Sequence, residues 1–207
     1  MRPLPRLHAF TDHTIMSASD FGIRAAAIAA GGVAVALHAR DRDGPGARLT
    51  AWTLRMVALA RPPEAAVFVS GRPDIAAASG AHGVQLGAGD VSPADARRVL
   101  PHGWVGRSVH TLDEARTAVQ EGADFLVLGS IYETPTHAGL SPVGTRLLGE
   151  VATLGKPVIG IGGITPEHVP ELKAAGAYGV AAIRALWQAD DPAAATLSML
   201  APWVEDR

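Results

Sequence analysis

The amino-acid sequence predicts an α/β protein of the compact (β/α)8 TIM-barrel class. Eight short apolar segments recur along the 207 residues, and segments with helical patterns fill most of the gaps between them. Strands that alternate with helices pair in parallel, and eight such units in about 200 residues fit a minimal closed barrel. A doubly wound open sheet is the alternative architecture, but eight evenly spaced units favour closure.

The individual elements are predicted from apolar runs and from their flanking residues. The expected strands are 6–11, 33–39, 65–70, 83–87, 104–110, 125–130, 157–162 and 179–184. A Gly-Ala pair precedes three of them, at 80–81, 122–123 and 176–177, and glycine suits the left-handed end of a helix. Helix starts are expected at Ser92-Pro93, at Thr111 with Glu114, and at Thr165-Pro166. Two of the expected helices are 112–121 and 166–175. No linker interrupts the pattern, so residues 1–207 are expected to form one domain.

Composition narrows the functional classes. Apolar residues make up 48% and charged residues 18% of a chain with a net charge of −2, which indicates a globular protein with no nucleic-acid partner. The sequence has no cysteine and no apolar run long enough to span a membrane. We therefore expect a cytoplasmic protein that binds a small molecule and does not enter a membrane. A homo-oligomer is compatible with the sequence.

In a barrel of this class the active site lies at the carboxyl ends of the strands. Gly162 and Gly163 follow the seventh predicted strand, and Ile183 and Arg184 end the eighth. Phosphate sites in such barrels lie between the last two strands, so we expect a phosphate group there. Arg40 and Arg42, two residues apart after the second strand, form either a second anion site or a solvated strand end paired with Asp41 and Asp43.

Three histidines, His38, His110 and His137, are expected at this mouth, where an imidazole that titrates near neutral pH suits proton transfer. The loop after the sixth strand adds polar groups at Ser130, Glu133, Thr134 and Thr136. No spaced set of His and Asp ligands appears. The sequence therefore predicts no metal site and no cofactor.

The chain resembles the family of thiamine phosphate synthase and its relative, the thiazole tautomerase. The resemblance extends over nearly the whole chain, through LHAFTD, VQLGAGDVSP, GRSVHTLDEA, GADFLVLGSIYETPT, VIGIGGITPEHV and GAYGVAAI. It implies a (β/α)8 barrel and a phosphorylated thiazole as ligand. Thr134 and Thr136 would hold the phosphate, Glu133 and His137 would frame the ring, and Ser108 in GRSVH would line the site.

Within this family, the motifs favour the tautomerase branch, which aromatises a carboxythiazole phosphate by proton transfer and needs no metal. The synthase pattern has Gln-x-Arg-x-Lys after the second strand, where this chain has His38-x-Arg40-x-Arg42. It also has a metal-binding aspartate where this chain has Gly71, which leaves Asp90 alone of the pair, and a lysine at the position of His137. The tautomerase histidine corresponds to Ser130, so we expect His110 to act as acid–base group, followed by His137 and His38.

Two other functions remain open on the sequence. One is a Mg²⁺-dependent thiamine phosphate synthase, which couples a pyrimidine diphosphate to a thiazole phosphate and is indicated by Asp90 and Arg40. The other is a non-catalytic binding protein for thiazole or thiamine phosphates, indicated by Ser130.

Overall fold

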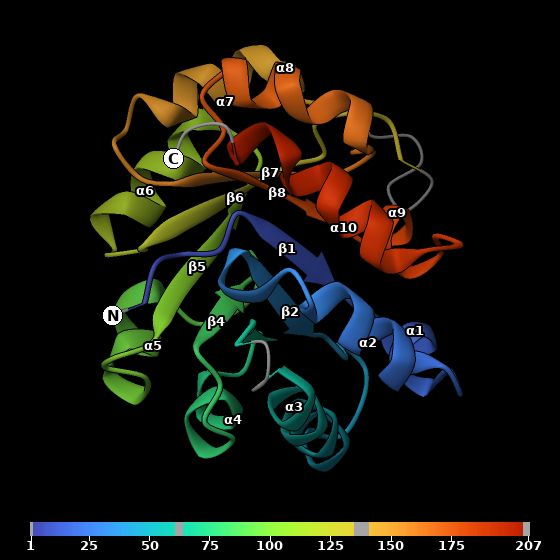
Figure 1. The fold of residues 1–207 in the computed structure, drawn as a ribbon. Helices are drawn as coiled ribbons and strands as arrows, with labels where there is room; N and C mark the ends of the chain where they lie inside the picture. The colour runs from blue at the N-terminus through green and yellow to red at the C-terminus, as the bar shows by residue number, and fades with distance from the viewer. Residues whose placement is uncertain (1, 61–63, 135–140, 205–207) are drawn as a thin grey trace.

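Eight parallel strands close into one barrel, in which each strand pairs with the next along the chain and the last pairs with the first. The computed structural model describes residues 2–60, 64–134 and 141–204. Figure 1 shows β1 and β8 side by side where the barrel closes, with the helices outside. The predicted (β/α)8 class is therefore confirmed.

Each strand lies inside its predicted range. The strands are β1 Leu7–Phe10, β2 Val35–Ala39, β3 Ala66–Ser70, β4 Gly83–Leu86, β5 Trp104–Val109, β6 Phe125–Gly129, β7 Val158–Ile161 and β8 Gly179–Ala182. Most of the strands end one or two residues before their predicted carboxyl-terminal residue, because the chain turns into loops at the mouth of the barrel. At β4, for example, the N–H of Gly87 bonds the carboxylate of Asp90 instead of continuing the ladder.

Helices and short 3-10 turns connect the strands. The α-helices are α1 His13–Ser17, α2 Phe21–Ala29, α3 Gly46–Ala60, α4 Pro73–Ala78, α5 Pro93–Val99, α6 Leu112–Gln120, α7 Gly144–Ala152, α8 Val169–Ala174, α9 Arg184–Trp187 and α10 Pro192–Leu200, and the 3-10 turns are η1 Gly32–Ala34, η3 Pro166–His168 and η4 Ala201–Trp203. The helix predicted at 166–175 is divided into η3 and α8. Pro170 has no N–H to donate to the carbonyl of residue 166, so the first turn is a 3-10 turn. None of the helices in the described ranges is long and apolar enough to cross a membrane.

The predicted helix signals are present as hydrogen bonds and backbone angles. Ser92 and Thr111 each accept a bond from the backbone N–H three residues on, at 3.1 and 3.2 Å. The glycines that end the helices before β4, β6 and β8 have positive φ angles of 66°, 87° and 100°. These local signals fix where each helix begins and ends.

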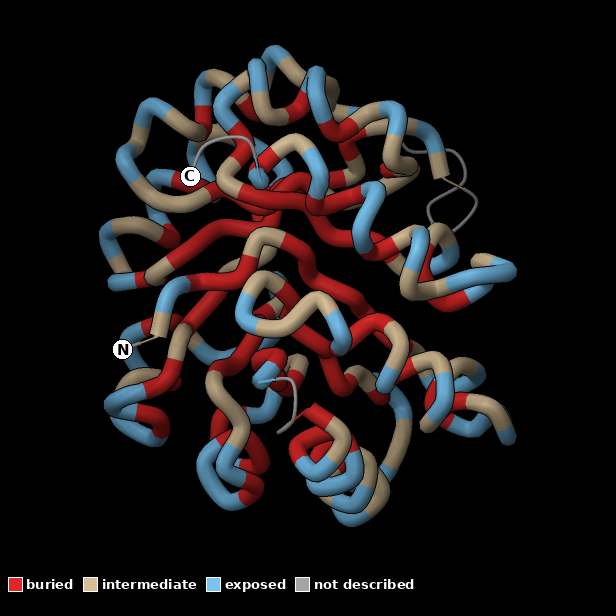
Figure 2. The backbone as a smooth tube through the Cα atoms, in the orientation of Figure 1, coloured by how far each residue is buried: buried red, intermediate tan, exposed pale blue. Residues whose placement is uncertain are grey.

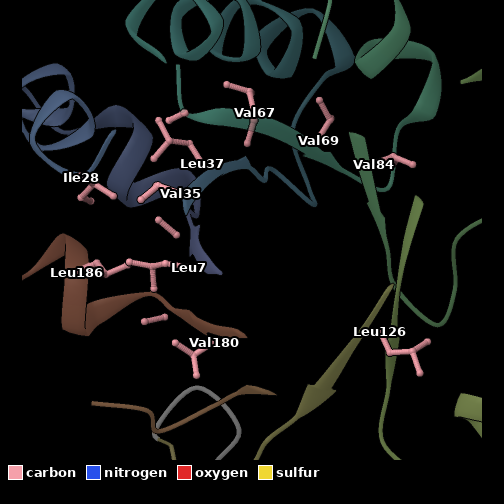
Figure 3. Close-up of a cluster of buried hydrophobic side chains, with 14 of the residues drawn as sticks. Leu7, Ile28, Val35, Leu37, Val67, Val69, Val84, Leu126, Val180 and Leu186 are labelled. Atoms are coloured by element: carbon pink, nitrogen blue, oxygen red, sulfur yellow. The ribbon is translucent and has the colours of Figure 1, made fainter. Parts of the chain in front are cut away.

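Alternation along the strands builds two apolar layers. One face of each strand packs against the helices, and Figure 3 shows this outer layer around Leu7, Leu37, Val67 and Leu126. The other face fills the barrel, and its apolar residues are Leu4, Phe10, Ala36, Ala66, Phe68, Phe125, Val127, Ile159 and Ala181. The strands accordingly appear as the buried centre of Figure 2. The inward face also carries the polar side chains that reach the mouth.

Candidate active site

Polar residues replace apolar ones where strands β3, β4 and β5 approach the mouth. Ser70, Gln85 and Ser108 follow the inward alternation of their strands, and Ser70 and Gln85 are partners in the register of β3 and β4. Gln85 Nε2 donates to Ser108 Oγ at 3.0 Å. An ideal Cβ on Gly106 would lie only 2.3 Å from Gln85 Oε1, so the glycine makes room for the amide. We call Ser70, Gln85 and Ser108 the polar floor.

Two atoms of this floor are buried without a hydrogen-bond partner among the described residues. They are the Oγ of Ser70 and the Oε1 of Gln85. A buried polar atom without a partner costs about 1–3 kcal/mol, and such groups are uncommon in native proteins. A floor of this kind is suited to a polar ligand that supplies the missing hydrogen bonds. The sequence reasoning missed Ser70 and Gln85, although their inward positions in the predicted strands were the available signal.

Below the mouth, two buried histidines form a hydrogen-bonded pair. His8 Nδ1 lies 2.8 Å from His38 Nε2, and His8 Nε2 lies 3.1 Å from the carbonyl oxygen of Pro5. The carbonyl only accepts, so His8 Nε2 donates to it and His8 Nδ1 accepts from His38. Burial lowers the pKa of His8 to about 4 and, with the charge of His8, lowers that of His38. Both imidazoles are therefore neutral at physiological pH.

His38 is enclosed by aromatic rings. It stacks on Phe10 at 3.9 Å and on Phe68 at 5.0 Å between ring centroids, and it has no exposed surface. Its Nδ1 is buried without a partner among the described residues. His38 therefore lies in the barrel interior, beneath the mouth rather than at its rim.

Arg40 and Arg42 extend from the end of β2. Arg40 is half-buried and its backbone N–H donates to Thr11 Oγ1 at 3.3 Å, whereas Arg42 is exposed. Burial and the charge of Arg42 lower the pKa of Arg40, and Asp12 and Asp43 act in the opposite direction. Asp41, one of the partners considered on the sequence, instead accepts a bond from Arg48 Nε at 2.7 Å.

The opposite side of the mouth is built by the loops after β6 and β7. Ile131 and Tyr132 donate their backbone N–H groups to Ile161 and Gly162 at 2.8 and 3.0 Å. An ideal Cβ on Gly162 would lie 2.5 Å from the Cβ of Ser130, and one on Gly163 would lie 2.5 Å from the carbonyl oxygen of Glu133.

The φ angles of Gly162 and Gly163 are 101° and 66°. Glycine is required at both positions because the two loops touch and because the backbone is left-handed. The double glycine thus lets the loop with Ser130 lie directly against the end of β7.

Arg184 joins this side of the mouth to the end of β8. Its Nη2 donates to Thr134 Oγ1 at 3.1 Å, and Ile183 before it packs against both apolar layers. A guanidinium, a threonine hydroxyl and a double glycine meet here, as an anion site between the last strands requires. Ser130 is half-buried and Glu133 is exposed on the same loop, whereas Thr136 and His137 lie outside the described residues.

His110 does not turn toward this loop. Its backbone N–H and its ring Nδ1 both lie within hydrogen-bonding distance of Glu114 Oε2 on α6, at 2.7 and 3.2 Å, and its side chain is 56% exposed. The acid–base roles expected for His110, His137 and His38 stay untested predictions.

The synthase pattern implies Mg²⁺ held by two aspartates, and the described residues do not fit such a site. Only Asp90 of the pair is present, since Gly71 occupies the other position. Asp90 Oδ2 accepts the N–H of Gly87 at 2.6 Å. Across residues 2–60, 64–134 and 141–204, no three His, Cys, Asp or Glu side chains gather as metal ligands.

The fold is a (β/α)8 barrel whose mouth gathers arginine, hydroxyl and glycine residues from several strand ends. A family model described as TMP-TENI, thiamine monophosphate synthase, matches residues 7–186, and the chain belongs to this family. Thiamine-phosphate synthase of Thermus thermophilus is 41% identical over 165 residues, which is 79% of each chain. That of Anaeromyxobacter dehalogenans is 41% identical over 182 residues, 86% of this chain and 82% of the relative. A solved structure of thiamine phosphate pyrophosphorylase from Pyrococcus furiosus is 28% identical in sequence and superposes with a TM-score of 0.82. The match covers 97% of this chain and 96% of that one.

These comparisons correct the prediction of a tautomerase. Relatives that are 34–41% identical and match most of the chain are thiamine-phosphate synthases, so the isomerase activity predicted from the motifs is wrong. That prediction gave weight to a few positions, such as Gly71, whereas the similarity to synthases is spread along the chain. The family is one of enzymes, and its named relatives here are transferases.

Proposed function

We propose that this protein is a transferase of the thiamine-phosphate synthase type, which couples a pyrimidine methyl diphosphate to a thiazole phosphate. In this reaction the bond between the methylene carbon and the diphosphate oxygen breaks, and the diphosphate leaves with the electron pair. A bond forms between that carbon and the thiazole ring nitrogen. The nitrogen already has a lone pair, so no proton has to be removed and no catalytic histidine is required.

The observation that carries the proposal is the division of the mouth into two chemically different halves. The β6–β8 half has Gly162, Gly163 and Arg184 with Thr134, which suit a phosphate monoester. The β2–β5 half has the polar floor and two arginines, which suit a polar ring that carries a diphosphate. Two adjacent half-sites are what a two-substrate coupling reaction needs.

Each half has a distinct task in this proposal. Arg40 and Arg42 would hold the diphosphate and stabilise the charge that develops on it as it leaves. Ser70 Oγ and Gln85 Oε1 would gain partners from the amino group and nitrogens of the pyrimidine ring. Thr134 and Arg184 would hold the thiazole phosphate so that its ring nitrogen faces the methylene carbon.

The direct test is a coupling assay with both substrates, in which thiamine phosphate and released diphosphate are measured by mass spectrometry. We expect both products in equal amounts. Arg40→Gln should reduce the rate about 10- to 100-fold, the equivalent of one charge-assisted hydrogen-bond pair, and Arg98→Gln on the exposed face of α5 serves as the control. Absence of product above the protein-free background would rule the proposal out.

The single carboxylate also favours a second candidate, a binding protein for thiazole or thiamine phosphates that does not turn over. Calorimetry separates the two candidates. Micromolar binding of thiazole phosphate together with no coupling would support the binding protein.

A further inference from the structure

We propose that this chain holds the diphosphate group with Arg40 and Arg42 and without a divalent metal ion. The inference rests on the proposed function for the identity of the anion. A synthase-type site is expected to need Mg²⁺. The residues at the ends of β2, β3 and β4 do not fit that expectation.

The first observation is the place where a second carboxylate would be. Gly71 has a φ of 72°, and an ideal Cβ on it would lie 3.1 Å from both carboxylate oxygens of Asp90. A side chain at position 71 would therefore stand directly against Asp90. With glycine there, the mouth presents one carboxylate at this point, and that carboxylate already accepts the N–H of Gly87.

The second observation is the cation beside Asp90. An ideal Cβ on Gly87 would lie 3.4 Å from Asp90 Oδ2 and 3.8 Å from Arg42 Nη2, so the carboxylate and the guanidinium flank the same point of the backbone. A divalent cation bound to Asp90 would be repelled by this neighbouring guanidinium. The synthase pattern also has a cation at position 42, a lysine, so the difference in this chain is the carboxylate that is missing at Gly71.

The third observation is that the two arginines are not neutralised by ion pairs. Within the part of the chain that the structure describes, neither guanidinium has a carboxylate within 4 Å, whereas Asp41 is committed to Arg48 and Asp74 to Arg72. Burial and the charge of Arg42 lower the pKa of Arg40, and Asp12 and Asp43 offset only part of this effect. The two guanidinium groups therefore repel each other. An anion bound between them would relieve this repulsion and would be held by forked donors that match phosphate oxygens.

Binding of inorganic diphosphate, measured by calorimetry in EDTA and in millimolar Mg²⁺, tests the inference. We expect the Kd in EDTA to be equal to or lower than the Kd in Mg²⁺, since Mg²⁺ reduces the charge of the anion that the arginines attract. Arg42→Gln should weaken binding in EDTA about 10- to 100-fold, and Arg98→Gln should leave it unchanged. Binding that requires Mg²⁺, or no binding in either buffer, overturns the inference.

Restoring the missing carboxylate gives a second test. Gly71→Asp should weaken binding in EDTA and make it respond to Mg²⁺, because two adjacent carboxylates repel the anion until a cation lies between them. Gly71→Asn controls for size, and aspartate and asparagine both tolerate a positive φ.

Gly80→Asp controls for charge, since Gly80 has a similar φ of 66° and a Cβ there would meet nothing within 4 Å. Thermal unfolding checks that each variant is folded. If Mg²⁺ changes diphosphate binding by folded Gly71→Asp no more than binding by Gly80→Asp, the role assigned to position 71 is wrong.

The two proposals fail in different ways. Metal-free diphosphate binding without formation of thiamine phosphate counts against the proposed function and leaves the anion site standing. Coupling that occurs only with Mg²⁺ supports the proposed function and overturns this inference.

Discussion

Arg184 donates a hydrogen bond from Nη2 to Thr134 Oγ1 over 3.1 Å, and this bond links the end of β8 to the loop after β6. The two residues are 50 positions apart in the chain, and both were predicted to contact a phosphate group. Their contact places a guanidinium and a hydroxyl side by side in the β6–β8 half of the mouth.

Arg184→Gln should therefore weaken binding of thiazole phosphate about 10- to 100-fold, the range of a charge-assisted hydrogen bond. Affinity for inorganic diphosphate should be unaffected, because that anion is assigned to the β2 arginines. Calorimetry with each ligand separates the two effects. Arg146→Gln on α7, whose side chain is 93% exposed, is the matched control. An equal loss for both ligands would show that the halves are not separate.

Gly162→Ala tests the contact between the loops after β6 and β7. An added methyl group would meet the Cβ of Ser130 at 2.5 Å, at a φ of 101°. Overpacking costs about 1–3 kcal/mol and a left-handed backbone about 1–2 kcal/mol. We therefore expect the free energy of unfolding to fall by about 2 kcal/mol or more.

The matched control for this change is Gly122→Ala. Gly122 has a φ of 87° and nothing lies within 4 Å of its ideal Cβ, so only the backbone cost of about 1–2 kcal/mol applies. Urea unfolding gives both values. Equal losses in the two variants would mean that Ser130 can move away without cost.

Gln85→Met should separate function from stability. The change removes a hydrogen bond to Ser108, worth about 0.5–1.5 kcal/mol, but it also removes a buried acceptor that has no partner among the described residues. We expect the free energy of unfolding to change by less than about 1 kcal/mol, while the KM for the pyrimidine diphosphate rises about tenfold.

Gln120→Met, at the exposed end of α6, is the control for the added methionine. Steady-state kinetics with the thiazole phosphate at saturation give the KM. An unchanged KM in Gln85→Met would remove Gln85 from the pyrimidine site.

The buried pair of His8 and His38 predicts a loss of stability in mild acid. The pKa of His8 is about 4 in the folded protein against 6.5 for the free side chain, and burial lowers that of His38 as well. The unfolded chain therefore binds more protons below pH 6.5, so stability is complete above pH 6.5 and decreases as the pH falls toward 4. The slope is about 1.4 kcal/mol per pH unit for each proton taken up.

Urea unfolding at several pH values between 7.5 and 4.5, chosen to span roughly the titration range of histidine, measures this slope. His38→Gln introduces the glutamine that the synthase pattern has at this position. In this variant the pH dependence of the free energy of unfolding should decrease by the equivalent of up to about one proton. Groups away from the pair titrate equally in both proteins, so the difference reports the loss of His38 together with any change in its partner His8. Identical slopes would contradict the assignment.

The sequence by itself determined the barrel and its local signals. Alternation of apolar residues, helix caps such as Ser92 and Thr111, and terminal glycines such as Gly122 are properties of neighbouring positions, so they can be recognised without knowing what packs against them. For the same reason the closeness of Gly162, Gly163 and Arg184 was predictable, because strand order alone brings the ends of β7 and β8 together.

The tertiary structure decided which of the expected groups meet and which remain without partners. His110 is three residues from Arg107 and close in sequence to the rim, yet its ring bonds Glu114 on α6, and His38 is enclosed by aromatic rings inside the barrel. The unpartnered atoms of Ser70 and Gln85, and the closeness of Gly71, Arg42 and Asp90, depend on side chains from different strands. Their distances are set by the stagger of the closed barrel and by the turns at its mouth, which no pattern of neighbouring residues encodes.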